Sequence, residues 1–385
     1  KRLSGDREGY SMGPSESAGL ALETGDRTYV IAEIGVNHDG NVGKALELVD
    51  AVAQAGADAV KLQTFEAETL VSAQAPKAAY QLITTPTEES QFEMLRRLEL
   101  SRDDHWAVLE AARRAGLEFL STPYDLDSLA FLVHELAVDR VKIASSDITN
   151  LPLLLAAGQS KRKVILSTGM STVEEITQAL STLALGGTTD VAGPSWDLIT
   201  SPPSRDGQSY LREHVVLLQC TSQYPAPVEE ANLQAIVTLR DLFGVPVGYS
   251  DHTLGTVAAL LSVAYGSVVY ERHFTLDRKA PGPDHSASIE PDEFAALVRM
   301  IREAELARGT GVKEPSPSES SNRHPMRKGL IARRAIKAGH VIGVEDVAFM
   351  RPVDGDTPAQ YWTWLGRTAD RDYATGEPLR STDDA

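Results

Sequence analysis

The chain has little of what secreted, membrane-spanning and nucleic-acid-binding proteins contain in quantity. It has one cysteine, Cys220, in 385 residues, so no disulfide can form within it. No apolar run approaches the roughly 20 residues that a helix needs to cross a bilayer. Positive charge is also scarce, because 37 Lys and Arg face 54 Asp and Glu. These absences exclude a disulfide scaffold, argue against general binding to nucleic acids or anionic membranes, and predict a cytoplasmic protein.

The composition that remains is that of a globular protein with two domains of unequal size. Hydrophobic residues make up 42% of the chain, enough to build a sizeable core. The length exceeds one ordinary domain, but a barrel of about 250 residues with a small appendage accounts for it. Residues 313–325 are rich in Pro and Ser and indicate a linker. The predicted domains are therefore residues 28–312 and 326–385, preceded by a flexible tail, residues 1–27, without the apolar core of a signal peptide.

Short apolar runs alternate with helical patterns along the first domain. Residues 43–54 carry apolar side chains at the one-face spacing of a helix, and residues 291–308 form the last such pattern. Eight strand-like runs, with no GxGxxG fingerprint after the first, favour an α/β fold of the closed (β/α)8 (TIM) barrel type over an open doubly wound sheet. The predicted strands are residues 29–35, 58–64, 118–123, 140–145, 164–169, 215–221, 245–250 and 267–275.

Two segments are too long to be ordinary connections. Residues 66–90 follow the second strand and therefore lie on the side of a barrel where active sites are built, which makes this segment a candidate lid. Residues 186–212, where Gly, Pro, Ser and Thr cluster, precede the sixth strand and are expected on the opposite face, as an insertion that interrupts the repeat.

The carboxyl ends of the predicted strands carry polar side chains that a purely structural barrel does not require. Because all eight ends converge on one mouth, these side chains are expected to meet there. They are Glu33, Asn37, Lys61, Gln63, Thr122, Lys142, Ser145, Ser167, Ser222, Tyr224, Ser250, His252, Glu271 and His273. The 281–290 loop adds Asp284 and His285, which either contact sugar hydroxyls or belong to a plain Pro/Gly turn.

Two lysines and two histidines in this set suggest ligands. Lys61 and Lys142 end apolar strands, where burying a lysine is costly unless an anion pairs with it, so they predict a phosphate or carboxylate ligand. The alternative is that each pairs with a buried Asp or Glu. His252 and His273 end neighbouring strands, so both could bind one divalent ion, with Glu271 or water completing its coordination. The alternative is that each is a hydrogen-bonded structural residue.

The order of the motifs along the chain resembles that of the sialic acid synthase family. The matching segments are IAEIGVNHDG, DAVKLQTF, LSTPYD, VKIASSD, ILSTGMST, CTSQYPAP, GYSDHT, ERHFTLD and GPDHSAS. The resemblance spans residues 29–366, and the second domain is similar to the antifreeze-like (SAF) domain of these enzymes. Ser222, the pair Ser146 and Asp147, and Arg272 depart from the family pattern. These departures leave the acceptor sugar open.

The resemblance implies a reaction and a role for each site residue. C3 of phosphoenolpyruvate attacks the open-chain aldehyde of an N-acyl mannosamine-type sugar, water adds at C2, and phosphate leaves. A divalent metal polarises the aldehyde; Mn²⁺ is implied, with Mg²⁺ or Co²⁺ as alternatives. The implied metal ligands are His252 and His273, and the implied catalytic residues are Glu33, Lys61, Lys142 and Glu271. The implied substrate-binding residues are Gln63, Thr122, Ser145, Ser167, Ser222, Tyr224, Ser250, Asp284 and, reaching across a domain-swapped homodimer, Arg351.

Other functions remain open at this point. The enzyme could instead make legionaminic or pseudaminic acid, or a related sugar acid of a secondary-metabolite pathway. A class I aldolase would use a lysine as a Schiff base and need no metal. A carbohydrate-binding protein would use the second domain for recognition and would have no need of a paired metal and phosphate site. Phosphate release that a chelator abolishes is expected only of the synthase.

Overall fold

The computed structural model describes residues 27–86 and 88–381. The chain divides into two units, Lys1–Gly309 and Thr310–Ala385, and each is described by itself. The predicted tail, residues 1–27, lies outside the described residues except for Arg27. In the described part of the chain, no helix is long and apolar enough to cross a membrane.

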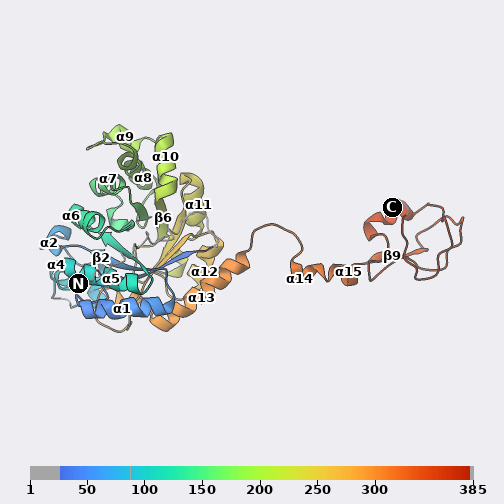
Figure 1. Cartoon of the computed structure of the whole chain (residues 1–385), viewed down its shortest axis with the longest axis horizontal. Coiled ribbons are helices and arrows are strands. Elements are labelled where there is room, and N and C mark those ends of the chain that lie inside the picture. The colour runs from blue at the N-terminus through green and yellow to red at the C-terminus, as the bar shows by residue number, and fades with distance from the viewer. Residues whose placement is uncertain (1–26, 87, 382–385) are drawn as a thin grey trace, which may run out of the picture. The chain divides into compact units, whose positions relative to one another are not determined.

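The first unit is a barrel of parallel strands wrapped in helices (Figure 1). Hydrogen-bonded neighbours follow the order β3-β2-β1-β8-β7-β6-β5-β4, so β3 and β4 end the ladder of the curled sheet. The strands are β1 Tyr29–Gly35, β2 Ala59–Thr64, β3 Glu118–Pro123, β4 Arg140–Ile143, β5 Lys163–Ser167, β6 Val215–Cys220, β7 Val247–Asp251 and β8 Val269–His273. The predicted (β/α)8 fold is confirmed, and all eight predicted strands are present.

Helices follow the strands and cover the outside of the barrel (Figure 1). They are α1 Val42–Ala55, α2 Ala67–Leu70, α3 Ala79–Thr84, α4 Gln91–Leu98, α5 Arg102–Arg114, α6 Leu126–Ala130, α7 Leu151–Gln159, α8 Val173–Thr188, α9 Trp196–Thr200, α10 Arg205–His214, α11 Gln234–Phe243, α12 Val257–Ala264 and α13 Pro291–Arg308. The local sequence sets where these helices begin and end, as α1 illustrates. Helix α1 begins after Asn41, whose side chain accepts a hydrogen bond from the backbone N–H of Lys44. It ends at Gly56, which adopts the left-handed conformation that glycine allows.

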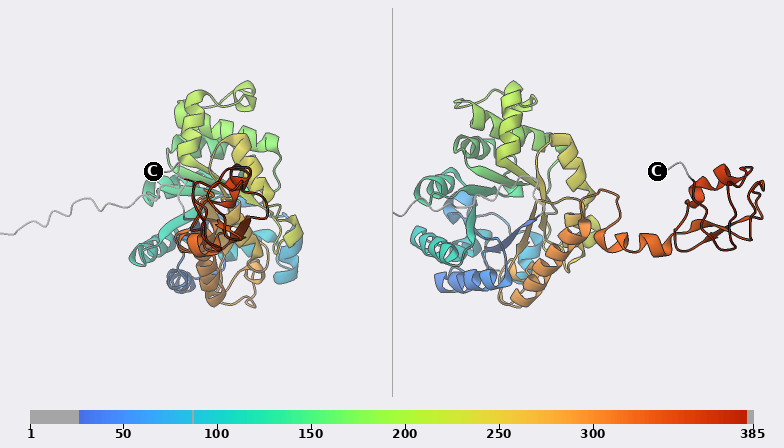
Figure 2. Two further views of the ribbon diagram at one scale, coloured as in Figure 1. Left: turned by 90° about the vertical axis from the view of Figure 1, so that its right-hand side faces the viewer. Right: turned by 45° about the vertical axis from the view of Figure 1, so that its right-hand side comes forward.

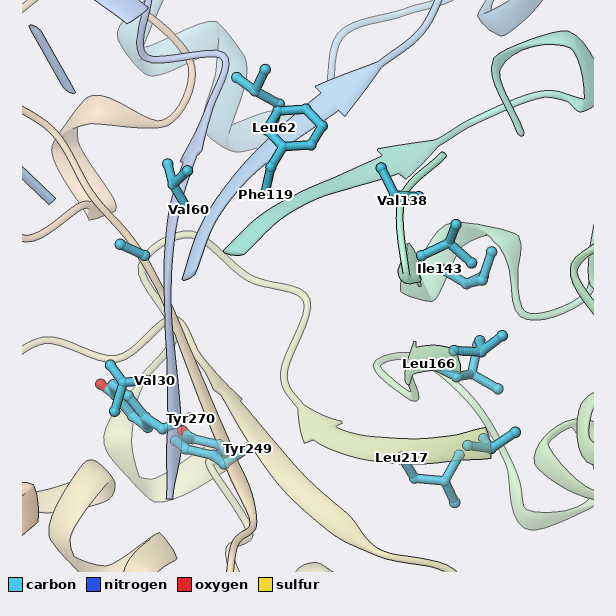
Figure 3. Close-up of a cluster of buried hydrophobic side chains, with 14 of the residues drawn as sticks. Val30, Val60, Leu62, Phe119, Val138, Ile143, Leu166, Leu217, Tyr249 and Tyr270 are labelled. Atoms are coloured by element: carbon cyan, nitrogen blue, oxygen red, sulfur yellow. The ribbon is translucent and has the colours of Figure 1, made fainter. Parts of the chain in front are cut away.

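Strand β1 illustrates how polar residues reach the barrel interior. Successive strand residues point to opposite faces. Val30 and Ala32 join the large apolar core between sheet and helices, part of which Figure 3 shows. Tyr29 and Ile31 join a separate apolar core inside the barrel. Glu33 continues this inner series and, at the carboxyl end of the strand, faces the mouth.

The expected insertion over residues 186–212 is largely helical. Gly186 and Gly187 lie within α8. Glycine is needed at both positions because α8 packs too closely on its neighbours for a residue with a side chain. A Cβ on Gly186 would lie 2.4 Å from the carbonyl oxygen of Leu155, and one on Gly187 would lie 2.3 Å from the ring of Tyr210. These glycines permit close packing of α8 on its neighbouring helices. Glycine in this stretch is therefore a mark of helix packing, although a cluster of Gly, Pro, Ser and Thr is typical of a loop.

The second unit is small and has a core of its own. It contains α14 Pro317–Ser320, α15 Arg323–Met326, α16 Tyr361–Trp364 and an antiparallel pair, β9 Gly329–Ala332 and β10 Val347–Met350. Figure 2 shows that loops make up most of it. Its core gathers around Trp364, whose indole N–H donates to Asp356 at 2.8 Å. The stretch predicted as a linker, residues 313–325, holds α14 and most of α15.

Candidate active site

All but two of the residues that the sequence predicts at the barrel mouth line one cavity at the carboxyl ends of the strands. The cavity has a volume of about 430 Å³. Its lining includes Glu33, Lys61, Gln63, Thr122, Lys142, Ser145, Ser167, Ser222, Tyr224, Ser250, His252, Glu271, His273 and Asp284. The two that do not line it are Asn37, predicted at a strand end, and His285, predicted in the 281–290 loop. Asn37 is buried and donates to the Phe274 carbonyl and to Ser288, and His285 is buried beside Thr275.

A compact cluster of buried ion pairs forms the floor of the cavity. The Lys61 Nζ lies 2.8 Å from a carboxylate oxygen of Glu33 and 2.9 Å from one of Glu271. The Lys142 Nζ lies 3.5 Å from the other oxygen of Glu271, which also accepts a hydrogen bond from Ser250 at 2.8 Å. The alternative raised for the lysines, pairing with buried acids, therefore holds, and it holds inside the predicted ligand cavity.

The cluster keeps its members ionised despite burial. Burial alone would raise the pKa of Glu33, but the charges of His273 and Lys61 outweigh it and hold that pKa far below the ordinary value. Burial would lower the pKa of Lys61, but Glu271 and Glu33 outweigh it and raise that pKa. Lys142 differs, because burial and the nearby charge of Lys61 lower its pKa against the attraction of Glu271. Lys142 is thus the less strongly held of the two cations.

Two imidazoles stand side by side at the cavity wall. The ring centres of His252 and His273 are 5.6 Å apart, and the ring of Tyr224 packs against both. Burial, followed by the charge of His273, lowers the pKa of His252 to about 4, so it is neutral at pH 7. Its Nδ1 donates to the Thr221 carbonyl at 2.7 Å, which leaves the Nε2 lone pair for a ligand. The Nδ1 of His273 has no hydrogen-bond partner among the described residues.

These donors fit a divalent metal with an open coordination sphere. A metal-binding histidine commonly donates its other N–H to a carbonyl, as His252 does. Within residues 27–86 and 88–381, no group of three or more His, Cys, Asp and Glu is arranged to hold an ion. The barrel therefore offers two imidazoles, and a substrate oxygen and water would have to supply the remaining ligands.

A second buried network lies behind the histidines. Asp251 and Arg272, the residues before His252 and His273, form an ion pair at 3.0 Å on the outer face of the sheet. Asp251 also accepts hydrogen bonds from Tyr249 and Tyr270. This network ties the ends of β7 and β8 together, and it explains how the unexpected Arg272 is accommodated.

The loop after β8 brings a further carboxyl group into the cavity. An oxygen of Asp284 lies 3.6 Å from the Nδ1 of His273. Burial raises the pKa of Asp284, although the charge of His273 opposes the rise. The next residue, His285, anchors the loop: its ring is within 2.7 Å of the Thr275 hydroxyl and 3.2 Å of Asp39. The loop is therefore an ordered wall of the cavity rather than a plain turn.

Hydroxyl groups gather on the opposite side, at the ends of β4, β5 and β6. The Ser145 hydroxyl accepts from the backbone N–H of Gly169 at 3.0 Å and lies 3.2 Å from the Cys220 sulfur. The buried Ser167 hydroxyl has no hydrogen-bond partner in the described part of the chain. With Ser222 and Lys142 alongside, these groups form a set of donors suited to an anion.

The cavity also has apolar lining that the sequence did not reveal. Residues of the 66–98 segment, including Leu70, Val71, Met94 and Leu95, form one side of it. The candidate lid over 66–90 therefore does line the site. The spacing of these apolar residues is that of ordinary core residues, so the sequence carries no signal that distinguishes a cavity-lining residue from a core residue. Arg351, the remaining predicted site residue, is exposed in the second unit.

Comparisons with known proteins divide the chain into the same two parts as the structure, the barrel unit and the small second unit. The NeuB family model matches residues 48–313, and the SAF domain model matches residues 327–383. The chain belongs to the NeuB family. It is 40% identical to an N,N'-diacetyllegionaminic acid synthase of Campylobacter jejuni over 354 residues, covering 92% of this chain and 99% of the relative.

Two further relatives of this NeuB-family chain come from other bacteria. An N,N'-diacetyllegionaminic acid synthase of Legionella pneumophila is 42% identical over 351 residues, 91% of this chain and 93% of the relative. The crystal structure of an N-acetylneuraminic acid (sialic acid) synthetase from Leptospira borgpetersenii superposes with a TM-score of 0.64 at 32% identity, covering 77% of this chain and 91% of that one.

Proposed function

We propose that this chain is a synthase that condenses phosphoenolpyruvate with the open-chain form of an N-acyl mannosamine-type sugar, giving a sialic-acid-type 2-keto sugar acid and phosphate. The observation that carries the proposal is one cavity in which a buried Lys–Glu cluster lies beside two histidines suited to a metal. The names of the relatives, synthases of legionaminic and N-acetylneuraminic acids, support the same chemistry.

In this reaction one side of the cavity binds phosphoenolpyruvate and the other side binds the acceptor sugar. Ser145, Ser167, Ser222 and Lys142 bind the phosphate and carboxylate of phosphoenolpyruvate, as charged and hydroxyl donors converging on an anion do. Gln63 and Tyr224 face the acceptor sugar, and Thr122 completes the anion side. Glu271, held by Lys61, Lys142 and Ser250, keeps both lysines in place so that they do not repel each other.

The bond changes define what the acids and bases must do. C3 of the enol forms a bond to the aldehyde carbon, and the aldehyde oxygen takes up a proton to become a hydroxyl. Asp284, whose pKa is raised, is suited to hold that proton. Water adds at C2, and the C2–O bond to phosphate breaks to leave a ketone. Glu33, held ionised 3.4 Å from the Nε2 of His273, is suited to accept a hydrogen bond from that water and orient it, because a carboxylate whose pKa is held so low is a weak base. Of the two protons that the water loses, one leaves on the phosphate and one restores Asp284.

A bound divalent metal, which we expect to be Mn²⁺ with Mg²⁺ or Co²⁺ as alternatives, supplies Lewis-acid polarisation of the aldehyde. His252 and His273 would hold it. Arg351 would complete the acceptor site from the SAF domain of a second copy in a domain-swapped homodimer. A Schiff base at Lys61 is disfavoured, because Lys61 lies between two carboxylates that raise its pKa, whereas a Schiff base requires a neutral amine.

Oxygen labelling tests the proposal. The protein is incubated with Mn²⁺, an acceptor sugar and phosphoenolpyruvate that carries ¹⁸O in the C2–O–P bridge. Cleavage of the C2–O bond places the label in the released phosphate, whereas ordinary phosphatase action cleaves P–O and leaves phosphate unlabelled. Sugar-dependent release of labelled phosphate, abolished by a chelator, is expected. Release without sugar, or of unlabelled phosphate, would refute the synthase.

A further inference from the structure

The two strands that carry the paired histidines are joined at their ends by a buried ion pair. The ladder between β7 and β8 ends at Asp251 and Arg272, and the next residues are His252 and His273. In the described part of the chain, no ladder contact between β7 and β8 lies beyond that pair. His273 is also fixed by its ladder contact with Glu33 on β1. The position of His252 relative to His273 therefore depends on side-chain contacts at the end of β7.

Arg272 contacts the β7 side of the site both before and after His252. Its Nη1 donates to an oxygen of Asp251 at 3.0 Å and to the carbonyl oxygen of Gly255 at 3.0 Å. Successive strand residues point to opposite faces, so Arg272 lies outside the sheet while the two imidazoles lie inside the barrel. One side chain on β8 thus holds the chain at positions 251 and 255, on either side of the histidine.

Asp251 fixes the backbone at His252 directly. One of its oxygens accepts from the backbone N–H of Thr253 at 2.8 Å and from the Thr253 hydroxyl at 2.8 Å, which closes an Asx-type turn over His252. The carboxylate also accepts from Tyr249 at 3.2 Å and Tyr270 at 2.8 Å, whose rings lie on the outer face (Figure 3). The Asp251 side chain is 0% exposed, so water does not compete for these bonds.

The energetics of this pair favour a role in geometry over one in stability. Arg272 is buried, and its Nε has no hydrogen-bond partner among the described residues. A buried ion pair is weak evidence for stability, because apolar residues of similar volume often stabilise a fold as well or better. Hydrogen bonds from a planar guanidinium to a carboxylate do, however, fix the distance and angle between the two groups.

We infer that Asp251 and Arg272 are positioning residues, which act through the backbone to set the separation and orientation of the His252 and His273 imidazoles for one divalent ion. This inference rests on the metal site of the proposed function. Substituting a residue that orients a metal ligand typically lowers metal affinity roughly 10 to 100-fold. Because the two residues hold each other, breaking the pair from either side should have the same effect, and their losses should not add.

The test measures Mn²⁺ affinity by electron paramagnetic resonance, and thermal unfolding without metal, in the wild type and four variants. Arg272→Met removes the guanidinium and keeps much of its volume. Asp251→Asn keeps the shape and the oxygen that binds Thr253 but removes the charge that Arg272 needs. Each should lower Mn²⁺ affinity roughly 10 to 100-fold. The double variant should bind Mn²⁺ about as weakly as the weaker of the two single variants.

Arg140→Met is the matched control. Arg140 is also buried, has one nitrogen without a partner among the described residues, and donates to Glu118 at 2.5 Å. Tyr29 donates to the same carboxylate. These three residues begin β4, β3 and β1, at the end of the barrel away from the cavity. Arg140→Met should lower the midpoint of thermal unfolding, as Arg272→Met does, with Mn²⁺ affinity unchanged.

The outcomes separate the positioning role from the metal site and from the reaction. Mn²⁺ affinity that Arg272→Met and Asp251→Asn leave unchanged overturns the positioning role, as does an equal loss in Arg140→Met. Fully additive losses in the double variant overturn the joint action of the pair. If Arg272→Met does not fold, Asp251→Asn decides against the same control. A wild type that binds no Mn²⁺ overturns the metal site and this inference together, whereas release of labelled phosphate judges the condensation by itself.

Discussion

Replacing Lys61 with methionine tests the buried charge cluster on which the site depends. The Lys61 side chain is 2% exposed and contacts two carboxylates at 2.8 and 2.9 Å. Methionine fills most of the same volume but leaves Glu33 and Glu271 facing each other without the cation between them. Breaking a buried ion pair by removing one partner costs about 3 to 5 kcal/mol, so we expect a loss of that size in the free energy of unfolding at pH 7.5.

The pH dependence of this loss follows from the signs of the pKa shifts. In the wild type, burial would raise the pKa of both glutamates, but nearby cations outweigh it, His273 and Lys61 at Glu33 and Lys142 and Lys61 at Glu271. The lowered pKa values contribute stability that is present above the unfolded-state value of about 4.3 and is lost as pH falls. Without Lys61 both pKa values rise, and the carboxyl groups can take up protons while still folded. The difference between variant and wild type should therefore shrink as pH falls from 7.5 to 5.

The assay is urea unfolding of the metal-free protein, followed by circular dichroism at both pH values. Lys44→Met is the control, because the pair of Lys44 with Asp39 at 2.5 Å is partly exposed and should be worth under about 1 kcal/mol. A loss for Lys61→Met below about 1 kcal/mol, or one that is equal at both pH values, would refute the reasoning. The variant should also lose phosphate release, because Glu33 would no longer be held ionised.

Three further predictions concern the metal, the acceptor and the helix packing. His273→Ala should lower Mn²⁺ affinity by more than the roughly 10 to 100-fold that loss of an outer-shell partner costs, with the circular dichroism spectrum unchanged; undiminished Mn²⁺ binding by electron paramagnetic resonance would contradict the assignment. Arg351→Ala, like deletion of residues 326–385, should raise KM for the sugar far more than KM for phosphoenolpyruvate, and a fully active truncated chain would contradict this. Gly187→Ala should destabilise the barrel by about 1 to 3 kcal/mol, because its Cβ would meet the Tyr210 ring at 2.3 Å. Gly193→Ala is the matched control, because a Cβ at that position would have no atom within 4 Å. Thermal unfolding of both variants is the measurement.

The strand ends were predictable because barrel geometry turns position along a strand into position in space. Glu33, Lys61 and Glu271 are far apart in the chain, yet each lies on the inner face in the middle or carboxyl half of its own strand. The parallel register then places them side by side: Glu33 pairs with Lys61 on one side and with His273 on the other. The alternation of strand residues between the two faces of the sheet, together with the assumption of a barrel, was enough to predict that these residues meet.

The lid segment and the 186–212 stretch were less predictable for a different reason. Whether Leu95 lines a cavity or a core depends on what faces it, and a helical pattern of apolar residues is the same in both cases. Gly186 and Gly187 resemble loop residues in the sequence, but they are helical because α7 and α10 approach closely. In each case the deciding neighbour comes from another part of the chain.

The order of residues alone is sufficient to determine the barrel, its two-domain plan and the set of polar residues at the mouth, because strand periodicity and motif order are local properties. Only the folded chain shows how those residues combine. It pairs both lysines with Glu271, keeps His252 neutral by burial, and sets an apolar wall opposite the anion site. Pairing, burial and shape arise from contacts between distant segments, and a linear sequence does not specify their distances.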